Sequence, residues 1–294
     1  MTPDHGQRFI FDGHPVRGQF ACLEQALQDV FGQHPYPPRV AEQLGQALVA
    51  AALLGDTLKF EGSLILQIKG DGPLGTLMVE RDDQGRLRGI ARHDEDNPVL
   101  VTGTGLDNLY GKAYLAISLF PKDGERYQGI VAMQGDTLAQ VIDGYFAQSE
   151  QLPTRLWLTA DGNKAAGMLL QQLPPNAGEI LEDGYWEHLT TLAETVTPDE
   201  LKNLSAEELL HRLYHEETLR LFDGHNLSFH CSCSRERSAR ALSQLGRDDL
   251  IDLMNEQNTV EVDCQFCGQI YQYDQTDLSW LTNEQAAPGS DQLQ

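Results

Sequence analysis

The sequence predicts an α+β fold in three consecutive parts: a large N-terminal domain of antiparallel sheets with inserted helices, a helical linker, and a small C-terminal domain. Strand-like alternation predominates between residues 8 and 175, an acidic segment with helix-capping patterns follows, and four of the five cysteines lie near the end. We place the boundaries at residues 1–178, 179–226 and 227–294. Domains usually span roughly 100–200 residues, so the last part is small enough to need a staple such as a metal.

The strands are predicted from the alternation of apolar and polar side chains. In residues 63–69, Leu64, Leu66 and Ile68 fall on one face, which is the period of a half-buried strand. Turn residues such as those at 82–85 separate the runs and indicate hairpins. Further strands are expected over residues 75–80, 86–92, 112–120 and 126–134 and, in a closing hairpin, 154–160 and 164–172.

Helices are expected between these strands. Residues 23–31 and 40–54 are two candidates. A third follows Asp136, a candidate N-cap residue, because apolar residues then recur at helical spacing. The absence of a regular βαβ alternation favours antiparallel sheets over a parallel one.

The acidic segment from Glu179 to Asp223 carries 12 acidic and 3 basic residues, a net charge of −9 in 45 positions. Two capping boxes, at 197–200 and 205–208, predict short successive helices. The apolar positions of these helices are expected to cover a sheet face while the acidic face stays solvated. Among these positions are Leu201, Leu204, Leu209, Leu210 and Leu213.

The composition excludes several classes of protein. With 40% hydrophobic and 22% charged residues, the chain has the composition of a soluble globular protein. The longest apolar run, 47–54, has eight residues, whereas a membrane span needs roughly 18. The first residues lack a signal peptide pattern, so a cytoplasmic location with reduced cysteines is expected. A net charge of −23 disfavours nucleic acid and anionic membranes as partners.

The close cysteine pairs are the strongest chemical signal. Cys231 and Cys233 form a CxC motif, and Cys264 and Cys267 form a CxxC motif 30 residues further on. Four thiolates complete a tetrahedron around Zn²⁺ and leave no open position for a catalytic water. The sequence therefore predicts a closed Cys₄ zinc site in the C-terminal domain.

The function of such a site stays open on the motif alone. Most closed Cys₄ sites are structural, which favours a constitutive binding module with a structural zinc. Zinc also keeps sulfurs as thiolates, which oxidants attack, and each ligand has a neighbour with which to form a disulfide. The same close pairs suit a thiol–disulfide oxidoreductase, a third possibility.

Other motifs carry weaker signals. The G-x-G-x-x-G pattern at 70–75 is followed by a strand-like run, which disfavours a dinucleotide-binding turn. The segment 105–112 lacks P-loop spacing and is expected to be a hairpin turn. His211 and His215 are expected on an exposed helix face. Cys22 is expected on an amphipathic helix as a buried small hydrophobe. No catalytic residue is predicted, and the chain is not expected to be an enzyme.

Nearly the whole chain resembles the thirty-three-kilodalton heat-shock protein family, the redox-regulated bacterial chaperones. The C-terminal match includes residues 229–237 and 262–267, so every position of the family's CxC and CxxC ligand pattern is filled. The stretches that carry the resemblance further upstream are Gln67-Ile-Lys-Gly-Asp-Gly-Pro-Leu74, Arg88-Gly-Ile-Ala91, Gly124-Glu-Arg-Tyr-Gln-Gly-Ile-Val131, Ser149-Glu-Gln-Leu-Pro-Thr154, Ala165-Ala-Gly-Met-Leu-Leu170 and Arg212-Leu-Tyr-His-Glu-Glu217.

The resemblance implies an ATP-independent holdase chaperone that binds unfolding client proteins. It implies that reduced Cys231, Cys233, Cys264 and Cys267 bind one Zn²⁺ in an inactive form. Oxidation would pair Cys231 with Cys233 and Cys264 with Cys267, release the zinc, unfold the C-terminal domain and favour a homodimer. Two short helices, after Ser234 and Gly246, are expected between the ligand pairs.

Overall fold

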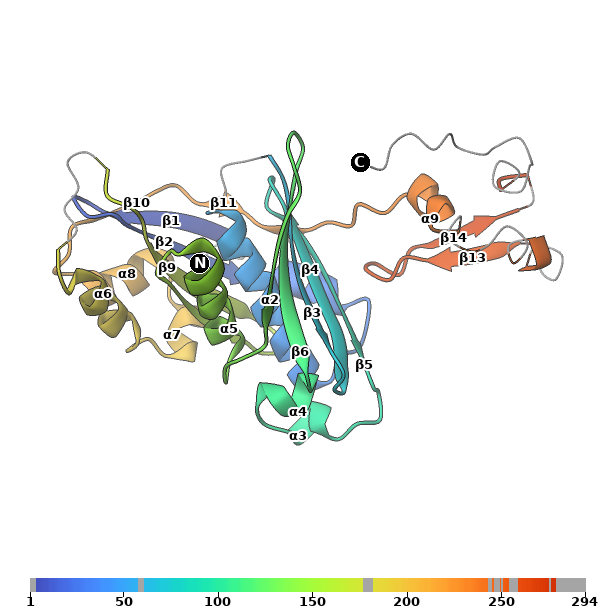
Figure 1. Ribbon diagram of the computed structural model, residues 1–294, viewed down its shortest axis with the longest axis horizontal. Helices are drawn as coiled ribbons and strands as arrows, with labels where there is room; N and C mark the ends of the chain where they lie inside the picture. Colours follow the sequence, from blue (N-terminus) through green and yellow to red (C-terminus); the bar gives the residue numbers. More distant parts are fainter. Residues whose placement is uncertain are drawn as a thin grey trace. The chain divides into compact units, whose positions relative to one another are not determined.

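The computed structural model describes residues 4–57, 61–176, 182–242, 245, 249, 251–253, 259–274 and 276–278. The chain divides into two compact units, Met1–His230 and Cys231–Gln294. Within the described residues, the first unit holds two six-stranded sheets and several helices, and the second holds a two-stranded sheet and a helix (Figure 1). The predicted α+β fold class is therefore confirmed.

The first sheet, called sheet A, has the strand order β10-β1-β2-β9-β8, with β11 beside β1, and its pairings are antiparallel. Its strands are β1 (His5–Phe11), β2 (Val16–Leu23), β8 (Thr154–Ala160), β9 (Ala165–Gln172), β10 (Leu219–Leu221) and β11 (His225–Asn226). Strands β8 and β9 are the predicted closing hairpin. Strands β1 and β2 were not predicted, because β2 is buried along most of its length and shows no clean alternation.

The second sheet, called sheet B, has the order β12-β5-β4-β3-β6-β7, and only the pairing of β12 with β5 is parallel among the described strands. Its strands are β3 (Gly62–Gly70), β4 (Leu74–Asp82), β5 (Arg86–His93), β6 (Ala113–Pro121), β7 (Tyr127–Ala132) and β12 (Ser228–Phe229). The predicted strands of this sheet are confirmed to within two residues at each end. Residues 71–73 join β3 to β4, and a strand follows the glycine pattern at 70–75, as the alternation of residues 76–80 predicted.

The helices of the first unit include one long central helix, α2, and several short ones. They are α1 (Gln25–Phe31), α2 (Pro38–Gly55), α3 (Val99–Thr102), α4 (Leu106–Tyr110), α5 (Leu138–Tyr145), the π-helix η1 (Phe146–Glu150), α6 (Tyr185–Ala193), α7 (Pro198–Asn203) and α8 (Ala206–Tyr214). Helix α2 begins with a proline at its first turn, where the missing N–H has no intrahelical partner to lose.

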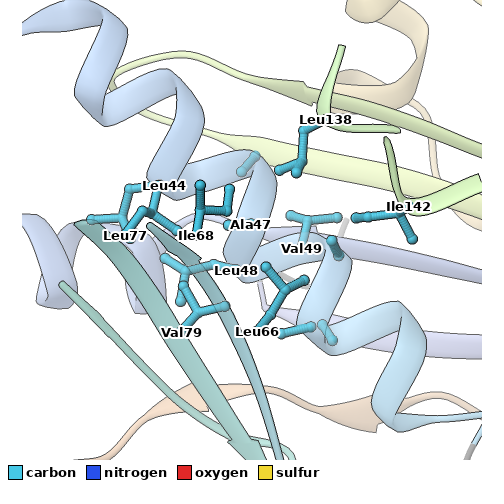
Figure 2. Packing of buried hydrophobic residues seen from close by; sticks show 14 of the residues in the cluster. Leu44, Ala47, Leu48, Val49, Leu66, Ile68, Leu77, Val79, Leu138 and Ile142 are labelled. Carbon is cyan, nitrogen blue, oxygen red and sulfur yellow. The ribbon is translucent and has the colours of Figure 1, made fainter. Parts of the chain in front are cut away.

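Helix α2 lies between the two sheets and contacts strands of both. Figure 2 shows Leu44, Leu48 and Val49 of α2 within the main buried cluster, to which β3, β4 and α5 also contribute. Small residues bring the helix close to both sheets. A Cβ atom at Gly45 would lie 2.7 Å from Cβ of Ala160 in β8, and one at Gly89 in β5 would lie 3.0 Å from Cδ1 of Leu44. A larger residue at position 45 would therefore require Ala160 to move, and one at position 89 would require the Leu44 side chain to shift by a few tenths of an ångström.

Helices α6 to α8 cover the other face of sheet A. Leu209 and Leu213 of α8 belong to a buried cluster with Phe20 and Met168, whose side chains point away from α2. The predicted role of the apolar linker positions is thus confirmed, although Leu204 is only partly buried. Both predicted capping boxes are present, with Thr197 and Ser205 as N-caps. These helices belong to the first compact unit.

Three local predictions are wrong. The N-cap of α5 is Thr137, whose hydroxyl accepts a hydrogen bond from the Gln140 amide at 3.2 Å, and Asp136 lies one residue earlier. Residues 105–112 contain the short helix α4 and do not form a hairpin turn. Cys22 lies on strand β2 and not on a helix. A strand buried on both faces lacks the polar alternation that would have distinguished it from a helix.

Candidate metal centre

A β-hairpin in the second unit carries the CxxC motif. Strand β13 (Val260–Asp263) pairs antiparallel with β14 (Ile270–Tyr273). In the turn between them, the carbonyl of Cys264 accepts hydrogen bonds from the amides of Cys267 at 3.2 Å and Gly268 at 2.7 Å. Gly268 has a φ of +65°, which a residue without a side chain adopts at low cost. The turn therefore brings the two cysteines of this pair together at one end of the hairpin.

The CxC motif is held by the start of the helix that follows it. Helix α9 (Arg235–Leu242) begins after Ser234, whose hydroxyl accepts a hydrogen bond from the Arg237 amide at 3.2 Å. The Arg237 guanidinium reaches back and donates to the carbonyl and the hydroxyl of Ser232, at 2.8 and 2.7 Å. Since Ser232 lies between the two cysteines, these contacts fix the path of the CxC loop. The predicted helix after Ser234 is confirmed, whereas Gly246 and the chain beyond residue 278 lie outside the described residues.

The four sulfur atoms form one compact cluster. All four lie within 4.8 Å of one another, with 3.6 Å between Cys231 and Cys264 and 3.4 Å between Cys233 and Cys267. Sulfurs bound at about 2.3 Å to a tetrahedral zinc would lie about 3.8 Å apart. In the part of the chain that the structure describes, no other group of three or more His, Cys, Asp or Glu side chains is placed to hold a metal. The predicted ligand set can therefore hold a metal ion.

Cys233 differs from Cys231 and Cys267 in the direction of its pKa shift. Burial opposes ionisation of Cys233, but hydrogen bonds from Tyr271 and the neighbouring thiols outweigh it and lower the pKa of Cys233 below its usual value. Burial raises the pKa of Cys231 and of Cys267. All four cysteines are partly exposed, so a small oxidant in solution has access to them.

The buried apolar core of the second unit is small among the described residues. Its buried residues there are Ala239, Leu242, Val260, Tyr273 and Leu278. A core of this size supplies only a few kcal/mol, so a unit of this kind usually depends on a metal or on disulfides. The sulfur cluster brings together the CxC loop and the β13–β14 hairpin, the two parts of the second unit that a bound metal would join.

Tyr271 and Arg237 belong to the site, although sequence reasoning did not identify them. Tyr271 lies opposite Val262 in the β13–β14 register, and its hydroxyl donates a hydrogen bond to the Cys233 sulfur at 3.1 Å. The alternation of Tyr271 and Tyr273 on a strand beside the CxxC motif was the available signal. It specifies the strand, but it does not specify which sulfur the hydroxyl reaches.

The other candidates lie in the first unit. His211 and His215 are exposed at the end of α8, with ring centroids 6.2 Å apart, as predicted for a solvated helix face. Cys22 is 3% exposed, and burial raises the pKa of its thiol to about 11. Cys22 is therefore buried, as predicted, and its raised pKa disfavours the thiolate form.

Comparison with known families agrees with this architecture. The family model described as "Hsp33 protein" matches residues 4–274. A "33 kDa chaperonin" of Pseudomonas syringae pv. syringae (strain B728a) is 50% identical over 283 residues, which cover 95% of this chain and 93% of the relative. The "33 kDa chaperonin" of Azotobacter vinelandii is 50% identical over 281 residues, 95% of this chain and 94% of the relative.

A solved structure shares the fold. The crystal structure of the 33 kDa chaperonin (heat shock protein 33 homolog) from Thermotoga maritima matches with a TM-score of 0.78, covering 95% of this chain and 98% of that one at 21% identity. None of the described helices is long and apolar enough to cross a membrane.

Proposed function

This chain belongs to the Hsp33 protein family of chaperones, and on that premise we propose that it is a redox-regulated, ATP-independent holdase. In this proposal the reduced, zinc-bound form is inactive, and oxidation of the four cysteines activates it. The observation that supports the proposal most directly is the cluster of four partly exposed sulfurs within 4.8 Å of one another. A cluster of this kind serves both as a metal ligand set and as a source of two disulfides.

Zinc, when bound by Cys231, Cys233, Cys264 and Cys267, keeps the sulfurs as thiolates and joins the CxC loop to the β13–β14 hairpin. We propose that oxidation then pairs Cys231 with Cys233 and Cys264 with Cys267. For each pair, two thiolates, one hydrogen peroxide and two protons give one disulfide and two waters. The two disulfides leave no thiolate to hold the metal.

Loss of the four ligands is expected to unfold the second unit. Structural zinc contributes roughly 10–16 kcal/mol of apparent folding free energy in small domains, whereas the apolar core of the second unit contains five buried residues among those described. The chain leaves the first unit through residues 225–229, which pair with both sheets as β11 and β12. We propose that unfolding spreads from there to the layer of α6 to α8 and uncovers apolar surface of sheet A.

The apolar face under α6 to α8 suits unfolding proteins as partners. It includes Phe9, Phe11 and Phe20, and aromatic side chains offer a large apolar area. We propose unfolding client proteins as the ligands, a homodimer as the active form and the cytoplasm as the location. Nucleic acids and anionic membranes are not proposed as partners, since the chain carries a net charge of −23. The proposal assigns no catalytic residue.

The test compares the metal content and the aggregation suppression of the full chain before and after peroxide treatment with mild warming. The expected result is release of one zinc per chain together with suppression of client aggregation in the oxidised protein alone. Equal protection by the reduced zinc form would contradict the switch. Catalytic turnover of a disulfide substrate would instead indicate the oxidoreductase alternative.

Two variants sharpen this test. Replacing Cys264 and Cys267 by serine should remove the metal and unfold the second unit. If the zinc is only structural, that variant loses the fold of the second unit without gaining any holdase activity. Cys22→Ala is the matched control, because it removes a cysteine outside the cluster and should leave zinc release unchanged.

A further inference from the structure

The phenol of Tyr271 links the two halves of the sulfur cluster through a hydrogen bond. Its Oη atom donates a hydrogen bond to Sγ of Cys233 at 3.1 Å. Tyr271 lies on β14, which belongs to the hairpin that carries Cys264 and Cys267, whereas Cys233 belongs to the loop before α9. The hydrogen bond therefore joins one ligand pair to the strand that supports the other.

This contact distinguishes Cys233 from the other three ligands. The Tyr271 hydroxyl donates to the sulfur of Cys233. The contacts that shift the pKa values of Cys231 and Cys267 come from backbone amides and from the other cysteines. The neighbouring Tyr273 directs its hydroxyl elsewhere and donates to the Arg235 carbonyl at 2.6 Å.

We propose that Tyr271 is a positioning residue that restrains the reactivity of Cys233, so that this sulfur reacts more slowly than its exposure alone would allow. The inference rests on the proposed redox function and concerns the regulation of the same site. A hydrogen bond donated to a thiolate occupies one of the electron pairs with which the sulfur attacks an oxidant, and charge-assisted bonds of this type are the stronger ones.

The oxidation step shows where the restraint acts. When the Cys233 thiolate attacks hydrogen peroxide, an S–O bond forms, the O–O bond breaks, and the departing hydroxide takes a proton to become water. The resulting sulfenic acid is attacked by a second cysteine thiolate, an S–S bond forms, and the S–O bond breaks with loss of hydroxide, which is protonated to water. In the first step the sulfur loses its negative charge, so the hydrogen bond from Tyr271 weakens as the transition state is approached.

Tyr271→Phe should therefore increase the reaction rate of Cys233 by roughly four- to twelvefold, if about half of a charge-assisted hydrogen bond is lost at the transition state. The experiment uses the full zinc-loaded chain and measures the modification of each cysteine by mass spectrometry after brief exposure to peroxide. The quantity compared is the ratio of the Cys233 rate to the Cys264 rate within one molecule. A general loosening of the unit raises both rates and leaves their ratio nearly constant.

Tyr273→Phe is the matched control, because it removes a phenol hydroxyl of the same strand that contacts the Arg235 carbonyl and the Ser238 hydroxyl and no sulfur. The proposal expects the ratio to rise in Tyr271→Phe alone. Equal ratios in the two variants, or an unchanged ratio in Tyr271→Phe, would overturn it. A more acidic fluorinated tyrosine at position 271 donates a stronger hydrogen bond and should lower the ratio, an effect that a purely structural role would not produce.

The same ratio can be measured with iodoacetamide, which forms an S–C bond to the thiolate and releases iodide without any redox step. A raised Cys233 ratio with iodoacetamide supports the role of Tyr271 even if oxidation fails to activate a holdase. An unchanged ratio in a protein that is nevertheless activated by peroxide would overturn the role of Tyr271 and leave the proposed function intact. The experiment therefore distinguishes a failure of the proposed role of Tyr271 from a failure of the proposed holdase function.

Discussion

The Nε2 atom of His225 lies 3.2 Å from Oδ1 of Asp56, which ties β11 to the C-terminal end of α2. The same carboxylate oxygen accepts a hydrogen bond from Arg81 of β4, a residue that is 6% exposed. Asp56 thus connects the central helix, sheet B and the segment that leads out of the first unit. A Cβ atom at Gly55 would lie 2.1 Å from Nη1 of Arg81, so the glycine before Asp56 makes room for this contact.

Asp56→Ala should destabilise the first unit by about 3–5 kcal/mol, because it leaves the buried Arg81 guanidinium without its carboxylate. The free energy of unfolding in urea measures the effect. Asp12→Ala is the matched control, since Asp12 pairs with Arg220, whose side chain is 60% exposed, and an exposed pair contributes less than about 1 kcal/mol. Similar losses of unfolding free energy in Asp56→Ala and Asp12→Ala would contradict the claim that burial makes the Arg81–Asp56 pair the more important one for stability.

Asp143→Asn should stabilise the protein at high pH and not at low pH. Burial raises the pKa of Asp143 to about 7, although Arg155 and the Leu156 amide favour the charged form. When the pKa of a carboxyl is higher in the folded than in the unfolded state, the folded protein loses stability as pH rises from about 4 towards 7. Asparagine can still accept the hydrogen bond from the Leu156 amide, recorded at 2.9 Å, and it carries no charge.

The gain from Asp143→Asn should be near zero at pH 4 and on the order of 1–2 kcal/mol at pH 8, after allowance for partial solvent access. Urea midpoints of both proteins across this range measure it. Asp161→Asn is a suitable control, because hydrogen bonds from Lys202 and backbone amides outweigh burial and lower the pKa of Asp161. That variant should be less stable than the parent by a nearly constant amount from about pH 5 to 8, because the stabilisation by Asp161 is lost only as the pH falls below about 4. A gain in the free energy of unfolding of Asp143→Asn that does not change with pH would contradict a raised pKa of Asp143.

Leu209→Ala should weaken the layer of α6 to α8 on sheet A. Leu209 is fully buried in the cluster with Phe20 and Met168, and deleting such a side chain costs about 2–5 kcal/mol. Hydrogen exchange of residues 185–214 should become faster than in the parent protein. Leu204→Ala removes a side chain of the same size from a partly buried position and should have a smaller effect. Equal exchange rates in the two variants would argue against the layer as a cooperative unit.

Removal of the metal by a chelator under reducing conditions should unfold the second unit and leave sheet B intact. The second unit has a small described core, whereas strands β3, β4 and β6 pack in the large cluster around α2. Hydrogen exchange should therefore lose protection over residues 260–273 and retain it over residues 62–82. Full protection of the hairpin after chelation would show that the unit folds without a metal.

The sequence by itself determined much of the architecture. Period-2 alternation located the strands of sheet B, since one face of each is buried and the other is more open. The two capping boxes located α7 and α8, because a side chain three residues away supplies the missing backbone partners locally. The CxC and CxxC spacing identified the four cysteines that the fold brings together. The pairing of the disulfides remains a prediction, since the four sulfurs are all close to one another.

Tertiary structure alone decided the features that depend on contacts distant in the sequence. Strand β2 could not be distinguished from a helix, because sheet A is covered by α2 on one face and by α6 to α8 on the other, which removes the polar alternation. Cys22 was therefore placed on the wrong element, although its burial was predicted. The contact of Tyr271 with Cys233 joins residues 38 positions apart. Such a contact depends on the relative placement of a hairpin and a loop, which local sequence patterns do not encode.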